Sequence, residues 1–208
     1  MRRIGFLIHA YTLYMMTTTL NDTAQSLLSN LGIDTTADFP VLEQLSDNRY
    51  LRDLKINVSN VLNNSQHLTR KEALLLALSV AANEKQQLLI DAFTKAAEAE
   101  GATAAELSET LACTSLLSTN NVYYRFRHFM DKEYYTTAQA GIRMSIMMTP
   151  VLGKEFFELM SLVVSAVNGC EMCVRSHEES VLKHGASEAR VLDAIRLGAV
   201  IKGLITVL

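Results

Sequence analysis

The sequence has 208 residues, of which 49% are apolar and 20% charged, and its net charge is −3. Such a chain is long enough to bury a core, and its composition excludes a disordered or fibrous protein. The small negative charge gives no reason to expect nucleic-acid binding. Three cysteines are too few for a secreted disulfide scaffold, and two prolines and nine glycines leave the composition biased towards helix.

The first 20 residues are expected to form a tail. Two arginines precede a short apolar run, as at the start of a signal peptide, but His9 interrupts the run and no small-residue cleavage site follows. We therefore expect residues 1–20 to be a frayed tail, or the true start to be Met15 or Met16, and the protein to be cytoplasmic. No apolar run reaches the length of about 18 residues that would span a membrane.

The first half of the chain predicts a succession of helices. Apolar spacing and end signals indicate helices at residues 21–31, 50–62, 69–82, 85–100 and 103–117, with a weak helical turn at 41–47. Two of them open with a capping box, at Thr69 and Thr103. We expect Asn120-Asn121 to end the last of these helices, and the aromatic, basic run 123–129 to form a separate packing helix.

The second half of the chain shows the same plan. Helices are expected at residues 153–167, 170–184 and 187–201. Asn83 and Asn168, which both close apolar helices, lie 85 residues apart. A helical unit therefore occurs twice, at about 68–117 and 153–203, which suggests duplication. Because no strand alternation is visible, we expect residues 21–208 to form a single all-α domain, a helical bundle of two related halves.

The second copy carries a cluster of reactive residues. Cys170 and Cys173 are followed by His177 and preceded by Glu158, which lies in an apolar stretch. If Cys170 opens a helix, then Cys170, Cys173 and His177 fall on one helical face. The N-terminus of a helix favours thiolate over thiol. A shift of 85 residues puts ordinary residues at the equivalent positions of the first copy: Lys85, Leu88, Ala92 and Ala73. Packing alone therefore does not require the reactive residues.

We interpret this cluster as a redox dithiol with an attached proton relay. Burying an unpaired carboxylate is costly, so Glu158 is expected to meet His177 across a helix pair and to orient its imidazole. His177, one turn beyond Cys173, would then accept the proton of that thiol. No metal or haem is needed for such a site.

Other interpretations of these residues stay open. A thioredoxin-like site needs a preceding strand, where a helix is expected here. Structural zinc needs four ligands, and Cys113, a possible third, lies in an apolar run that suits a small buried hydrophobe. The paired cysteines could also serve helix packing, Glu158 could face water, and His177 could be a surface histidine. Met144, Met147 and Met148 are expected to fill the core or an interface.

The pattern Glu158-x11-Cys170-x2-Cys173-x3-His177, with Asn168-Gly169 just ahead, resembles the AhpD (alkyl hydroperoxide reductase D) family, a branch of the carboxymuconolactone decarboxylase-like proteins. The resemblance covers about residues 40–208. It implies an all-α antioxidant enzyme, commonly a homotrimer, that reduces alkyl hydroperoxides. It also implies that Cys173 is the nucleophile that becomes a sulfenic acid and that Cys170 is the proton donor and resolving thiol. Glu158 and His177 would form the relay.

The resemblance implies partners as well as chemistry. The enzyme would regenerate the peroxiredoxin AhpC, hold no bound cofactor, and receive electrons from a lipoyl-bearing acyltransferase fed by dihydrolipoamide dehydrogenase and NADH. The family often carries a histidine immediately before the second cysteine, where this chain has Met172, which cannot carry a proton. We therefore expect direct peroxidase activity to be weaker than disulfide exchange. A decarboxylase or lactone-handling enzyme and a non-enzymatic thiol or zinc module remain alternatives, although decarboxylation needs no dithiol.

Overall fold

The computed structural model describes residues 20–208, so the expected tail at 1–20 lies outside the described residues except for Leu20. The described chain is built from helices and contains no strand, which confirms the all-α prediction. The helices are α1 (Asp22–Asn30), α2 (Pro40–Gln44), α3 (Arg49–Asn63), α4 (Arg70–Asn83), α5 (Gln87–Ala99), α6 (Ala104–Met130), α7 (Glu133–Thr137), α8 (Lys154–Val167), α9 (Glu171–Lys183) and α10 (Glu188–Ile205), with a 3₁₀ turn at Ser145–Met147.

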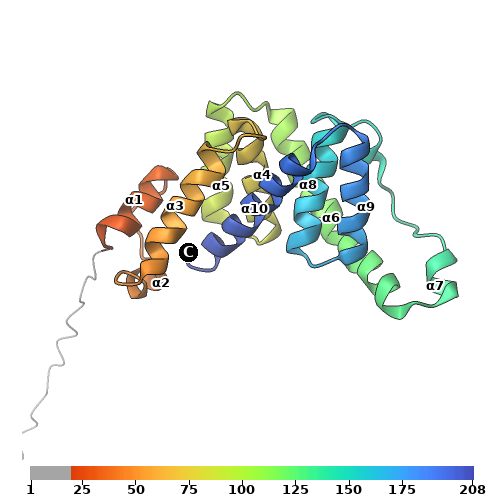
Figure 1. The fold of residues 1–208 in the computed structure, drawn as a ribbon, viewed down its shortest axis with the longest axis horizontal. Coiled ribbons are helices and arrows are strands. Elements are labelled where there is room, and N and C mark those ends of the chain that lie inside the picture. The colour runs from red at the N-terminus through yellow and green to blue at the C-terminus, as the bar shows by residue number, and fades with distance from the viewer. Residues whose placement is uncertain (1–19) are drawn as a thin grey trace, which may run out of the picture.

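The helices form an elongated arrangement (Figure 1). Helices α1 to α3 lie at one end, α4, α5 and α10 occupy the middle, and α6, α8 and α9 follow, with α7 projecting at the far end. Helix α10 packs against α3, α4 and α8, while α8 packs against α9 and α6. Helix α10 therefore ties the N-terminal helices to the half of the molecule that holds the cysteine pair.

Two central helices, α4 and α8, are buried along most of their length. Residues 73–81 of α4 and residues 156–165 of α8 are all buried, whatever side of the helix they occupy. A helix that is apolar on all sides is stable only inside a core, which explains why both sequences lack a polar face. The polar exceptions on α8 are satisfied locally or by neighbours; for example, Ser161 donates a hydrogen bond to the carbonyl of Phe157 at 2.8 Å.

The two copies of a helical unit predicted from the sequence correspond to α4–α6 and α8–α10. Each helix of the first copy begins 84 residues before its counterpart in the second copy. Helix α4, for example, begins at Arg70 and α8 begins at Lys154. The shift of 85 taken from the two asparagines is wrong by one residue, because Asn83 is the last residue of α4 whereas Asn168 is the cap that follows α8. At a shift of 84, the site residues correspond to Leu74, Gln86, Leu89 and Phe93. The first copy still lacks the chemistry, and three of these four residues are core side chains.

The expected helix break at Asn120-Asn121 is wrong, since α6 continues through both residues to Met130. Asn121 donates from Nδ2 to Ser165 Oγ at 2.9 Å and accepts from Asn168 Nδ2 at 2.9 Å. An asparagine breaks a helix by competing for its backbone hydrogen bonds, and here the side chain bonds to groups on and just after α8 instead. The run 123–129 is therefore the last part of α6 and not a separate helix.

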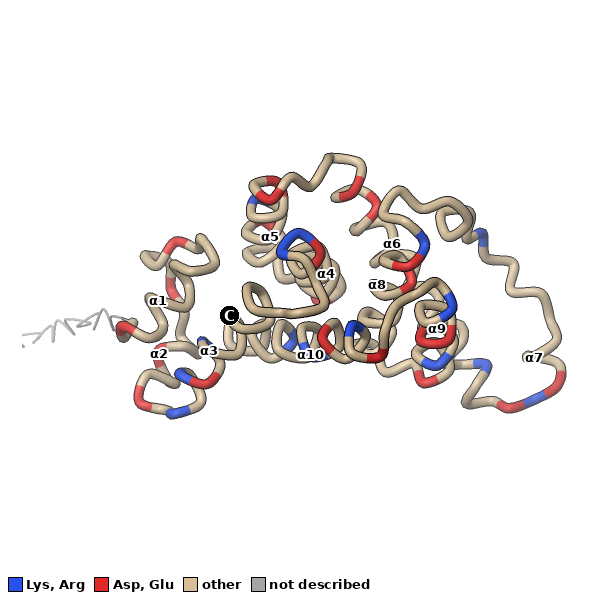
Figure 2. Tube along the Cα trace, turned by 45° about the horizontal axis from the view of Figure 1, so that its top comes forward, with Lys and Arg blue, Asp and Glu red and all other residues tan. Residues whose placement is uncertain are grey.

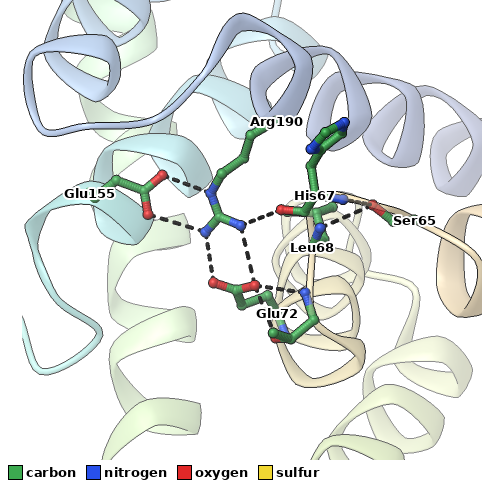
Figure 3. A network of polar contacts seen from close by, with 7 residues as sticks. Ser65, His67, Leu68, Glu72, Glu155 and Arg190 are labelled. Atoms are coloured by element: carbon green, nitrogen blue, oxygen red, sulfur yellow. Dashed lines mark hydrogen bonds and ion pairs between the residues drawn. The ribbon is translucent and has the colours of Figure 1, made fainter.

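A partly buried ionic network joins α4, α8 and α10 (Figure 3). The guanidinium of Arg190 on α10 contacts Glu155 on α8 at 2.8 Å and Glu72 on α4 at 2.7 Å. The Arg190–Glu155 pair occupies the positions that Lys71 and Glu106 occupy in the first copy, where the ion pair of 2.8 Å has the opposite polarity. The ion pair between these two positions is therefore present in both halves with its charges exchanged.

Positions of basic and acidic residues are interspersed along the described chain (Figure 2). Within residues 20–208, no helix is both long enough and apolar enough to cross a membrane.

Candidate active site

The reactive residues meet where α8 turns into α9. Gly169 takes a left-handed conformation with φ of 67°, which a glycine adopts without strain, and this reverses the chain between the two helices. The amide of Cys170 then donates back to the carbonyl of Ser165 at 3.1 Å. The turn fixes the start of α9 against the last turns of α8, so residues from the two helices can face one another.

Cys170 and Cys173 are joined by a disulfide. Cys170 is the N-cap residue of α9 and is fully buried, whereas Cys173 lies in the first helical turn, is 6% exposed and lines a pocket. The backbone N–H groups of a first helical turn have no partner within the helix. They form the positive end of the helix macrodipole, which stabilises a thiolate. Cys173 is therefore the sulfur that a molecule in the pocket can reach.

Glu158 and His177 form a buried pair across α8 and α9, with 2.6 Å between Oε2 and Nδ1. Burial alone would raise the pKa of Glu158, but hydrogen bonds from His177 and Lys154 outweigh it and lower the pKa from 4.5 to about 2. An ionised carboxylate can only accept, so Nδ1 of His177 carries the hydrogen and donates it. In the neutral ring this leaves Nε2 as the proton acceptor. The alternatives of a water-facing Glu158 and a surface His177 are wrong, since both are buried.

Lys154 is a further member of this cluster that the sequence reasoning missed. Its Nζ lies 2.8 Å from Oε1 of Glu158, one turn along α8. The same ammonium donates to the carbonyl of Met147 at 2.8 Å. Lys154 therefore holds the carboxylate and also fixes the 3₁₀ turn beside the pocket. The spacing of four residues between Lys154 and Glu158 could have indicated the ion pair.

The pocket beside Cys173 has a volume of about 370 Å³ and mostly apolar walls. Its lining residues come from α6, the 3₁₀ segment and α9: Asn120, Tyr124, Met144, Met147, Met172, Cys173, Ser176 and His177. Two of the three methionines expected as core or interface filler thus belong to the site, while Met148 is 80% exposed. The first half of the chain contributes to the site through α6, which sequence spacing could not indicate.

The third cysteine has a different environment. Cys113 on α6 is fully buried, with its Sγ 3.6 Å from Ser161 Oγ, and burial raises the pKa of its thiol to about 12. Such a thiol is a poor nucleophile and a poor metal ligand, because both roles need the thiolate. Among the residues that the structure describes, no group of three or more His, Cys, Asp or Glu side chains could hold a metal ion.

Comparison with known proteins gives two kinds of match. The sequence model of the carboxymuconolactone decarboxylase family matches residues 134–208, the part of the chain that includes the cysteine pair. The alkyl hydroperoxide reductase AhpD of Anaeromyxobacter dehalogenans is 42% identical over 150 residues, covering 72% of this chain and 80% of that protein. The AhpD of Coxiella burnetii is 37% identical over 164 residues, covering 78% of this chain and 91% of that protein.

Proposed function

Because the chain belongs to the AhpD family within the carboxymuconolactone decarboxylase-like proteins, we propose that it reduces alkyl hydroperoxides with the dithiol of Cys170 and Cys173. The observation that carries this proposal is the buried Glu158–His177 pair, whose histidine lies on the same helix as the pocket-lining Cys173. A thiol is activated when a nearby base takes its proton and a third group orients that base.

The first half of the cycle starts from the reduced protein. His177 Nε2 takes the proton of the Cys173 thiol, one helical turn away, and the Glu158 carboxylate stabilises the imidazolium. The thiolate attacks the terminal oxygen of the hydroperoxide, the O–O bond breaks, and the departing alkoxide takes a proton to become an alcohol. Cys173 is left as a sulfenic acid, oxidised by two electrons.

The second half of the cycle regenerates the dithiol. The Cys170 thiol condenses with the sulfenic acid, releases water and forms the disulfide seen in the structure. A thiolate of an incoming dithiol must attack a sulfur that it can reach, and Cys173 lines the pocket while Cys170 is fully buried. The mixed disulfide therefore forms on Cys173, Cys170 leaves as the thiol, and the second thiol of the donor completes the exchange.

The reducing partner belongs to the same proposal. The reduced, dihydrolipoyl form of a lipoyl group is a dithiol on a slender arm, and it matches an apolar pocket of about 370 Å³ that ends at a disulfide sulfur. We assign the reducing equivalents to a lipoyl-bearing acyltransferase and the regenerated partner to the peroxiredoxin AhpC. A reducing compartment such as the cytoplasm suits this cycle, because the disulfide must be reduced again in every turnover.

An oligomer is part of the proposal too. The end of α6 and helix α7, at one end of Figure 1, expose three large aromatic side chains: Phe126 (47%), Phe129 (74%) and Tyr134 (76%). Exposed apolar groups gathered on one projection are typical of a protein interface. They support a homo-oligomer, for which the family suggests a trimer.

Met172 changes the expected balance of activities. The side chain at this position lines the pocket next to Cys173, and a thioether cannot carry a proton. The relay proposed here therefore has one histidine, His177, and direct peroxide reduction is proposed to be slower than disulfide exchange.

The test is lipoamide-dependent reduction of cumene hydroperoxide by the wild type, Cys173→Ser and Cys113→Ala. We expect turnover by the wild type, its loss in Cys173→Ser and its retention in Cys113→Ala, because Cys113 lies outside the pocket. Equal turnover by Cys173→Ser and the wild type would remove Cys173 from the mechanism. Circular dichroism shows that each variant is folded.

A further inference from the structure

Asn120 presents an unsatisfied polar atom at the candidate active site. The side chain is 4% exposed, lines the Cys173 pocket, and donates from Nδ2 to the sulfur of Met144 at 3.3 Å. Its Oδ1 is the one buried side-chain nitrogen or oxygen in residues 20–208 without a hydrogen-bond partner. An unpartnered buried carbonyl costs free energy, so its presence beside a reactive sulfur points to a ligand that donates to it.

The neighbouring residue shows that the fold can satisfy an asparagine here. Asn121, which is also buried, makes hydrogen bonds through both its Nδ2 and its Oδ1, to Ser165 and Asn168. The free oxygen of Asn120 is therefore a property of its position on the pocket wall and not of α6 as a whole.

The duplication provides a second comparison. Helices α6 and α10 begin 84 residues apart, so Asn120 on α6 corresponds to Leu204 on α10. Leu204 is fully buried in the core. The same position in the same helical unit thus accepts an apolar side chain, and helix packing gives no reason for a carboxamide at residue 120.

We propose that Asn120 Oδ1 accepts the hydrogen bond of the hydroperoxide O–H and holds the terminal peroxide oxygen against Cys173. This proposal rests on the proposed function and adds a substrate-binding residue to it. A hydroperoxide has a single hydrogen to donate, and a neutral amide oxygen accepts that hydrogen bond without removing the proton. The alkyl group would lie against the apolar wall that includes Met144 and Met147. The ligand class is therefore an organic hydroperoxide with an apolar substituent.

The hydrogen bond would persist through the reaction. The Cys173 thiolate forms a bond to the terminal oxygen, the O–O bond breaks, and the electron pair leaves with the alkoxide, which takes the proton held by His177. The terminal oxygen keeps its own hydrogen and becomes the O–H of the sulfenic acid. Asn120 would hold this O–H in the product as it did in the substrate, which keeps the sulfenic acid in position for Cys170.

The two half-reactions separate this role from a structural one. The reduced protein is mixed with cumene hydroperoxide, and thiol loss is followed in time; the oxidised protein is mixed with dihydrolipoamide, and disulfide reduction is followed. The variants are Asn120→Leu, which copies Leu204, and Asn120→Ala, which leaves space if leucine does not fit. Thr119→Ala, an exposed change on the same helix, is the matched control.

We expect cumene hydroperoxide to oxidise both Asn120 variants about tenfold more slowly than the wild type, which corresponds to the loss of one hydrogen bond. We expect dihydrolipoamide to reduce both variants at the same rate as the wild type. Thr119→Ala should match the wild type in both reactions. Unchanged oxidation of the Asn120 variants, or an equal loss in both half-reactions, would overturn the proposal. A wild type that cumene hydroperoxide does not oxidise would instead remove the proposed function itself, and this proposal with it.

Discussion

Nδ1 of His177 lies 2.6 Å from Oε2 of Glu158, and this contact joins two buried side chains on consecutive helices. Lys154 binds the other oxygen of the same carboxylate at 2.8 Å. Because the pKa of Glu158 is lowered to about 2 by these two partners against the opposing effect of burial, Glu158 stays ionised at neutral pH. The proton that moves during the proposed cycle is therefore carried by His177, while Glu158 orients the ring.

The lowered pKa of Glu158 predicts a pH-dependent contribution to stability. The folded-state pKa of about 2 lies below the ordinary 4.5, so the carboxylate stabilises the fold above about pH 4.5, and this contribution is lost as the pH falls towards 2. Glu158→Gln should be less stable than the wild type near pH 6, and the difference should shrink near pH 3. Urea unfolding of both proteins at pH 6 and at pH 3 measures this difference in the free energy of unfolding. A difference that does not change with pH would show that the carboxylate is not held ionised.

Lys154→Met is expected to slow the oxidation of Cys173 by about tenfold, because it removes one of the two groups that hold Glu158 and so weakens the orientation of the catalytic base. It also removes the hydrogen bond to the carbonyl of Met147 on the pocket wall. Methionine keeps most of the apolar stem of lysine, so packing should change little.

The matched control for Lys154→Met is Lys95→Met, an exposed change on α5. Thiol loss under cumene hydroperoxide, followed in time for both variants, gives the rates. Equal rates for the two variants would mean that Lys154 does not support the relay.

Arg190→Leu is expected to lower the free energy of unfolding by about 3 kcal/mol, because it leaves two partly buried carboxylates, Glu72 and Glu155, without their shared cation. Arg175→Leu is the control, since its ion pair with Glu171 is exposed and should contribute less than about 0.5 kcal/mol. Urea unfolding at neutral pH compares them. Similar losses in both variants would show that the network contributes no more than a surface pair.

A thiol count distinguishes the three cysteines. The folded, oxidised protein should show no rapidly reacting thiol, because Cys113 is buried, and burial raises the pKa of its thiol to about 12. Unfolding the oxidised protein should reveal one thiol per chain, and reducing it before unfolding should reveal three. Rapid labelling of Cys113 in the folded protein would contradict the burial of α6 against α8.

The helices and the reactive cluster could be predicted from the sequence because both depend on local spacing. The capping boxes at Thr69 and Thr103 mark helix starts that the structure has. The contact between Glu158 and His177 could be expected because a carboxylate in an apolar run needs a partner.

The remaining features depend on tertiary contacts. The intrinsic preference of Asn120 and Asn121 predicts a helix break, but hydrogen bonds to neighbouring side chains override it. Tyr124 and Met147 reach the pocket only because α6 and the 3₁₀ turn pack beside α9, and no spacing along the chain records that approach. The helix bounds set the register of the two halves at 84 residues, one fewer than the spacing of Asn83 and Asn168, because these asparagines occupy different positions at their helix ends.

The identity of the nucleophile is tested most directly in Cys170→Ser, which removes the resolving thiol and puts serine, a favourable N-cap residue, at the start of α9. The reduced variant is treated with an equimolar amount of cumene hydroperoxide and a reagent specific for sulfenic acids, and the modified residue is found by mass spectrometry. We predict an adduct on Cys173 and none on Cys113. An unmodified Cys173, or an adduct on Cys113, would contradict the assignment of Cys173 as the sulfur that attacks the peroxide.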